Sequence, residues 1–194
     1  MDADNDEVII KQKSCCEEWC PHVFIFDYAA FNEKGEKVFS PNINLDSNVD
    51  TSKLQKRFVS YPLLDRLGSS EDYLGAKVYQ YAIPKQMLEE NQIRFNESIH
   101  FAEDLCFLYT VMRYAVTCKY IPGVYYKYNI IGNSVSHTYR NNFWEDWEKV
   151  LHYIKQQSTS NDEYEKVKLG VYCMELHYYA DHLSLAEYVD VVEK

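Results

Sequence analysis

The sequence lacks several features that would place it in familiar classes of protein. No stretch approaches the roughly 20 consecutive apolar residues that a membrane-spanning helix needs. The first residues are acidic, where a secretory signal peptide would carry basic and then apolar residues. There is no internal repeat and no low-complexity segment, which argues against solenoids and arrays. We therefore expect a cytoplasmic chain whose 194 residues form one compact body.

Basic residues are also scarce, with 20 Lys and Arg against 30 Asp and Glu, for a net charge of −10. A nucleic-acid surface needs clustered cations that displace counterions from phosphates, so this composition argues against a nucleic-acid partner. A phosphate-bearing ligand would need a metal ion or backbone dipoles to offset its charge.

Six cysteines are too few, in a chain of this length, for the disulfide framework of a small secreted domain. Cys15, Cys16 and Cys20 lie close to His22 and offer the ligand types that zinc prefers. No second Cys/His pair with zinc-ligand spacing follows, so we interpret the cysteines as buried free thiols. A zinc module is the alternative, and elemental analysis of the purified protein would detect its zinc.

Local patterns in the first two thirds of the chain predict a strand and several helices. Aromatic and β-branched residues at 22–31 predict a strand, and the turn-prone NEKGEK after it predicts a hairpin-like loop. Residues 7–19 and 52–67 have helical patterns, and Pro84 predicts the start of a helix through Gln92. Apolar residues at helical spacing over 101–118 predict a helix that buries one face.

Short strands and then helices are expected after that helix. Residues 119–121 and 124–128 predict two strands separated by the turn residues Pro122 and Gly123. The C-terminal third predicts two longer helices and a short one, over 144–157, 162–183 and 184–194. Their aromatic residues could stack on sugars or meet a membrane surface, but core packing is the better interpretation. These aromatic residues are Trp144, Trp147, Tyr153, Tyr172, Tyr178 and Tyr179.

Two acidic groups are candidates for chemistry. Asp2-Ala3-Asp4-Asn5-Asp6 places three carboxylates and an amide where alternate side chains can converge on a hard cation such as Mg²⁺ or Mn²⁺. A ligand-free acidic tail is the alternative. Glu103 and Asp104 open the predicted helix, where the macrodipole favours acids without any function. Apolar neighbours would partly desolvate them, however, and desolvation strengthens a carboxylate as a general base.

The order of several segments resembles that of bacterial family 2 glycosyltransferases of capsule and lipopolysaccharide synthesis. The segments are Ala76-Lys77-Val78-Tyr79, Met87 to Phe95, Glu103-Asp104-Leu105-Cys106-Phe107, Tyr125-Tyr126-Lys127-Tyr128 and Asn133-Ser134-Val135-Ser136-His137. Asp2 to Asp6 also resembles the family's Asp-x-Asp-Asp motif, and the strand at 23–28 follows at a similar spacing. The resemblance extends to about residue 155. It departs from the family pattern at Gly75, at Asn129 and before Asn133, and these departures affect the expected contacts with the acceptor more than the expected class of reaction.

The resemblance implies an α/β fold, the C-terminal part of an A-type, Rossmann-like glycosyltransferase followed by a helical segment. It implies inverting transfer of a sugar from a nucleoside-diphosphate donor to a glycan or lipid-linked acceptor in surface polysaccharide synthesis. Asp104 would be the general base and Glu103 its support. Asp2 and Asp4 would bind Mg²⁺ or Mn²⁺, and His137 would contact the metal or the diphosphate.

We divide the chain into a partial catalytic domain, 1–140, and a helical extension packed on it, 141–194. The family's nucleotide-binding half precedes its Asp-x-Asp motif, so we expect the chain alone to be inactive. We also expect it to self-associate through an unpaired edge of the strand at 23–28. A lipid-linked acceptor would bring the enzyme to the inner face of the cell membrane. The alternative is a non-catalytic remnant or binding module of glycosyltransferase ancestry, which would not bind uridine diphosphate and manganese.

Overall fold

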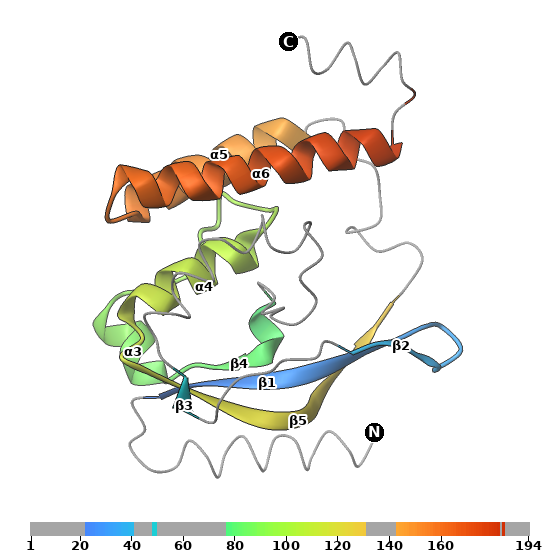
Figure 1. Ribbon diagram of the computed structural model, residues 1–194. Coiled ribbons are helices and arrows are strands. Elements are labelled where there is room, and N and C mark those ends of the chain that lie inside the picture. Colours follow the sequence, from blue (N-terminus) through green and yellow to red (C-terminus); the bar gives the residue numbers. More distant parts are fainter. Residues whose placement is uncertain (1–21, 41–47, 50–76, 131–142, 183, 185–194) are drawn as a thin grey trace.

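The elements of the protein form three layers (Figure 1). The computed structural model describes residues 22–40, 48–49, 77–130, 143–182 and 184. A sheet forms one outer layer, and the antiparallel helices α5 (Phe143–Gln157) and α6 (Asn161–His182) form the other. Helix α4 (Glu103–Tyr114) lies between them. In the part of the chain that the structure describes, no helix is long and apolar enough to cross a membrane.

The sheet is mixed, and β1 (His22–Phe31) lies in its interior. β5 (Thr117–Asn129) runs parallel to β1 along its whole length, and β3 (Asn48–Val49) pairs antiparallel with β5. β2 (Lys37–Phe39) and β4 (Tyr81–Ala82) pair antiparallel with β1. The predicted α/β class and the predicted strand at 22–31 with its hairpin are confirmed, whereas the Rossmann-like arrangement stays a prediction.

One edge of β1 is paired along its whole length, and the other is paired in part. β5 takes one edge, and β2 and β4 share the other. Residues 23–26 are buried without alternation, so both faces of this part of the strand are covered. The second edge pairs with β4 at Phe24 and Ile25 and with β2 at Ala30 and Phe31, so the predicted unpaired edge at 23–28 is wrong for its first part. Self-association through this strand stays a prediction.

Two further elements precede α4. The 3₁₀ helix η2 (Val78–Gln80) leads into β4, and α3 (Lys85–Glu90) follows with Pro84 as its N-cap. This agrees with the helix predicted from Pro84. The helices predicted over 7–19 and 52–67 lie outside the described residues, as does all of 184–194 except Ser184.

Helix α4 is buried on nearly all sides. Every residue from Leu105 to Met112 is buried, because the sheet and α5 pack against the helix from opposite directions. The predicted helix is therefore present, but it buries more of its surface than the one face that was predicted. Its predicted end at Cys118 is wrong, since residues 117 and 118 already belong to β5. Pairing with β1 satisfies their backbone groups in place of a longer helix.

One core joins the layers. Its buried side chains include Val23 and Ile25 of β1, the interior residues of α4, and residues of α5 and α6. The α5 and α6 contributions are Trp147, Val150, Leu151, Ile154, Val167 and Val171. Cys106 and Cys118 are free and buried, and burial raises the pKa of each thiol to about 12. For these two residues the interpretation as buried free thiols is confirmed, whereas Cys173 is free and only partly buried.

β5 is one strand with a bulge, so the prediction of two strands separated by a turn is wrong. Phe26 of β1 pairs with Ile121 and Asp27 with Val124, which leaves the two residues between them without a partner on β1. The Asp27 carboxylate holds the bulge, because it accepts hydrogen bonds from the Tyr120 hydroxyl at 2.8 and 2.9 Å and from the Gly123 N–H at 2.9 Å. A side chain on the neighbouring strand thus replaces the missing ladder bonds.

Gly123→Ala should destabilise the protein by about 1–3 kcal/mol. Gly123 has φ +133°, which a residue with a Cβ rarely adopts, and the added carbon would lie 3.0 Å from Tyr125 Cε2. Urea unfolding at constant pH would measure the change. Gly35→Asn is the control, because Gly35 has φ +76° in an open hairpin and Asn tolerates that region. Equal stability of Gly123→Ala and the parent protein would show that the bulge conformation is not required.

The two long C-terminal helices are confirmed, and their joint is fixed to α4. Tyr109 of α4 donates a hydrogen bond to the Glu163 carboxylate. Thr159 donates to the same carboxylate from its N–H at 2.9 Å and from its hydroxyl at 2.7 Å. Burial works to raise the pKa of Glu163, but these hydrogen bonds and the charge of Arg113 together lower it. Burial and Glu163 raise the pKa of Tyr109 to about 12, so it stays a neutral donor.

Glu163→Gln should therefore cost stability in a pH-dependent way. The carboxylate has a lower pKa folded than unfolded, so its contribution is complete above the unfolded value of about 4.3 and is lost as pH falls through the folded value. We expect the variant to be about 1–2 kcal/mol less stable at pH 7. Chemical denaturation from pH 7 to pH 3 should show this difference shrinking. A difference that is constant with pH would contradict the assigned network.

Candidate active site around Asp104

Asp104 lies in the first turn of α4 and is partly buried. Its Oδ2 accepts a hydrogen bond from the backbone N–H of Val78 at 3.1 Å. The residue before the helix, Ala102, has φ 50° and ψ 30°, and no side chain caps the helix there. The backbone of η2 therefore fixes the carboxylate, and the helix N-terminus favours its charged form.

The surroundings raise the pKa of Asp104. Burial is the largest cause, the Val78 hydrogen bond opposes it, and the charge of Glu103 adds to it. Glu103 itself is exposed. A carboxylate with a raised pKa binds a proton more readily than a solvated one, as a general base should. The two predicted carboxylates therefore have different environments. Asp104 is partly desolvated and hydrogen-bonded to Val78, whereas Glu103 is exposed and raises the pKa of Asp104 through its negative charge.

A group of tyrosines lies next to the residue that holds Asp104. The Tyr79 ring stacks on Tyr126 with centroids 4.2 Å apart and planes at 15°, and on Tyr128 at 5.9 Å and 17°. Tyr28 of β1 meets Tyr79 edge-on at 5.4 Å. Lys77 lies over the Tyr28 ring at 4.6 Å and donates a hydrogen bond to its hydroxyl. Tyr126 is 41% exposed, so this stack offers aromatic surface on rings that pack against Tyr79, the neighbour of the residue that holds Asp104.

Four of the segments that carry the family resemblance are linked by contacts, and one of these contacts involves Asp104. Val78 contacts Asp104, and its neighbour Tyr79 stacks on the tyrosines of 125–128. The segment 87–95 joins the group through Phe95, whose ring stacks on Phe107 at 4.1 Å and 5°. These segments are separated in the sequence, and their contacts join them in the folded chain.

The other predicted site residues cannot be placed. Asp2, Asp4 and His137 lie outside the described residues, as do Cys15, Cys16 and Cys20 of the zinc alternative. His22 begins β1 and shares a hydrogen bond with the Thr117 hydroxyl. Among the residues that the structure describes, no three His, Cys, Asp or Glu side chains converge as metal ligands would. The metal site therefore stays a prediction.

Sequence reasoning missed the tyrosine stack and the role of Val78. Tyr79 and the 125–128 segment were visible as aromatic positions, but only strand pairing between β1 and β5 sets which rings face η2. Every residue except proline has a backbone N–H, so the residue type at position 78 could not indicate the hydrogen bond to Asp104.

We compared the chain with family models, with curated proteins and with solved structures, and none of the three comparisons gives a match. The candidate site is therefore described from its own residues.

Proposed function

We propose that this chain carries the general base of an inverting glycosyltransferase. The enzyme would move a sugar from a nucleoside-diphosphate donor to a glycan or lipid-linked acceptor in surface polysaccharide synthesis. The observation that carries the proposal is a partly buried carboxylate whose pKa is raised, in a segment that contacts two other family-like segments through Val78 and Phe95 and a fourth through Tyr79. A carboxylate that only capped a helix would need neither burial nor an aromatic stack beside it.

The proposed reaction uses Asp104 to accept the proton of an acceptor hydroxyl. As that proton leaves, the hydroxyl oxygen forms a bond to the anomeric carbon of the donor sugar from the face opposite the diphosphate. The anomeric C–O bond breaks, and the diphosphate leaves with the electron pair, which inverts the configuration. Glu103 keeps Asp104 basic by repulsion, because its charge raises the pKa of its neighbour.

Two further groups complete the proposed site. The carboxylates of Asp2 and Asp4 have the hard oxygen atoms that Mg²⁺ and Mn²⁺ prefer, and they would hold such an ion with His137 nearby. When bound, the ion would neutralise charge on the leaving diphosphate. The exposed tyrosine surface beside Asp104 would orient a sugar ring against the base.

The test is a transfer assay with the protein translated from its complete open reading frame. A panel of labelled nucleoside-diphosphate sugars would be supplied with manganese and a mixture of bacterial surface oligosaccharides. We expect labelled product from one donor. Absence of product with every donor, together with no saturable binding of uridine diphosphate and manganese, would favour the non-catalytic remnant.

A further inference from the structure

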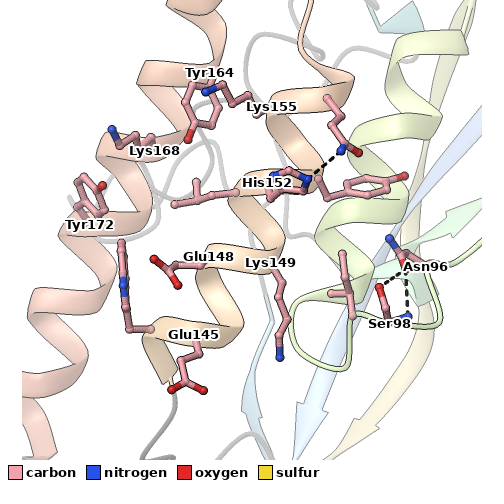
Figure 2. Close-up of a pocket in the computed structure, with 15 residues that line it drawn as sticks. Asn96, Ser98, Glu145, Glu148, Lys149, His152, Lys155, Tyr164, Lys168 and Tyr172 are labelled. Atoms are coloured by element: carbon pink, nitrogen blue, oxygen red, sulfur yellow. Dashed lines mark hydrogen bonds between the residues drawn. The ribbon is translucent and has the colours of Figure 1, made fainter.

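A groove of about 750 Å³ lies along α5, bordered by α6 on one side and by residues 96–99 before α4 on the other (Figure 2). Its size falls within the roughly 300–1,000 Å³ typical of sites for small ligands. Its lining comes from three separate segments of the chain, which share the core described above. The groove is therefore formed by tertiary packing.

Aromatic rings form part of the wall. Trp144, Tyr153, Tyr164 and Tyr172 are all partly buried, so each is anchored and still presents some ring surface. Trp144 packs on Tyr172 with centroids 5.3 Å apart, and the Tyr153 hydroxyl bonds Thr110 at 2.8 Å. Rings that are already ordered lose little entropy when a ligand stacks on them.

Polar groups form the rest of the wall. Glu145 and Glu148 lie one turn apart on α5 and are exposed, and neither forms an ion pair with another described residue. His152 and Gln156 share a hydrogen bond at 2.9 Å. Asn96 accepts hydrogen bonds from the N–H and hydroxyl of Ser98 at 3.0 and 2.7 Å. The wall of the groove thus combines carboxylate, imidazole, amide and hydroxyl groups with aromatic rings.

The charges of the groove narrow the class of ligand. Two of its three lysines are near carboxylates outside it: Lys149 lies 3.4 Å from Asp146 and Lys168 lies 3.8 Å from Glu165. With three lysines and two glutamates the lining has little net charge, so it favours neither a strongly anionic nor a strongly cationic ligand. A purely apolar ligand would bury those carboxylates without partners, which is costly. A neutral ligand with many hydroxyl groups and apolar C–H faces satisfies both the carboxylates and the rings.

We propose that this groove binds the acceptor glycan, an inference that rests on the proposed function. Ser98 lines the groove and Asp104 follows six residues later, so chain geometry limits their Cα separation to about 22 Å. Phe101, between them, packs edge-on against Trp147 of α5 at 5.1 Å, which ties this loop to the groove helix. One oligosaccharide of several sugars can span that distance.

The probe is a printed array of neutral oligosaccharides from bacterial capsules and lipopolysaccharides, followed by calorimetric titration of the strongest ligand. Trp144→Ala should weaken binding about ten-fold through the lost stacking surface. Glu148→Gln should also weaken it about ten-fold through the lost charge-assisted hydrogen bonds. Leu169→Ala and Glu89→Gln are matched controls at exposed positions outside the groove and should bind as the parent does.

The outcomes separate this inference from the proposed function. Asp104→Asn should bind the glycan normally while losing transfer, because binding in the groove does not need the base. No glycan bound, or a glycan whose binding neither groove variant weakens, would overturn the groove assignment whatever the enzyme does. Groove-dependent binding with full transfer by Asp104→Asn would overturn the base and leave the groove as a glycan site. If Trp144→Ala does not fold, the binding measured for Glu148→Gln tests the groove assignment alone, because Glu148 is exposed and its substitution should leave the fold intact.

Discussion

Replacing Asp104 by Asn should lower the rate of sugar transfer by about 10²- to 10⁴-fold, the usual cost of losing a general base. Asn keeps the shape of the side chain and an oxygen that accepts the Val78 N–H, so η2 stays anchored to α4. It cannot take a proton at neutral pH. Steady-state transfer with saturating donor would measure the loss, and circular dichroism would verify the fold.

Glu103→Gln is the control for this prediction, because it changes charge next to Asp104 without touching the proposed base. Loss of the neighbouring negative charge should lower the pKa of Asp104, since that charge raises it. The acid limb of the pH profile of kcat/KM should therefore move to lower pH, while the maximal rate changes much less than in Asp104→Asn. Near-normal transfer by Asp104→Asn would reassign the base, with Glu103 as the next candidate.

The position of Asp104 explains why a helix start suits a base. The helix N-terminus and the Val78 N–H both stabilise the carboxylate form, whereas burial destabilises it. Burial is the larger effect, so the group retains affinity for a proton without losing its fixed orientation.

Local signals were sufficient for the elements whose structure is set by their own sequence. The strand at 22–31, the helix from Pro84 and the long C-terminal helices follow from periodicity and proline chemistry. The ends of α4 and the continuity of β5 were mispredicted, because both depend on pairing with β1. Pro122 and Gly123 have the composition of a turn, and only the Asp27 carboxylate on another strand makes them a bulge.

The aromatic residues of the last helices show the same limit. Periodicity favoured core packing for all of them, and Trp147 is indeed 3% exposed. Trp144, three residues earlier, packs against the same core and also lines the groove, as do Tyr153 and Tyr172. Helix α5 lies between α4 and α6, so one of its rings is fully buried while others touch the core and remain partly open to the groove (Figures 1 and 2). That difference depends on the neighbouring helices rather than on the spacing of the aromatic residues.

Leu108→Ala should lower the free energy of unfolding by about 2–5 kcal/mol, a large part of the roughly 5–15 kcal/mol that stabilises a domain. Leu108 is 0% exposed in the middle of α4 and belongs to the core that joins the layers, so truncation would leave a buried cavity. Leu169→Ala, the same change at a 55% exposed site on α6, should alter stability by less than about 0.5 kcal/mol. Denaturant midpoints with unchanged slopes would measure both values. Similar losses in the two variants would mean that α4 is not enclosed between the sheet and the helix pair.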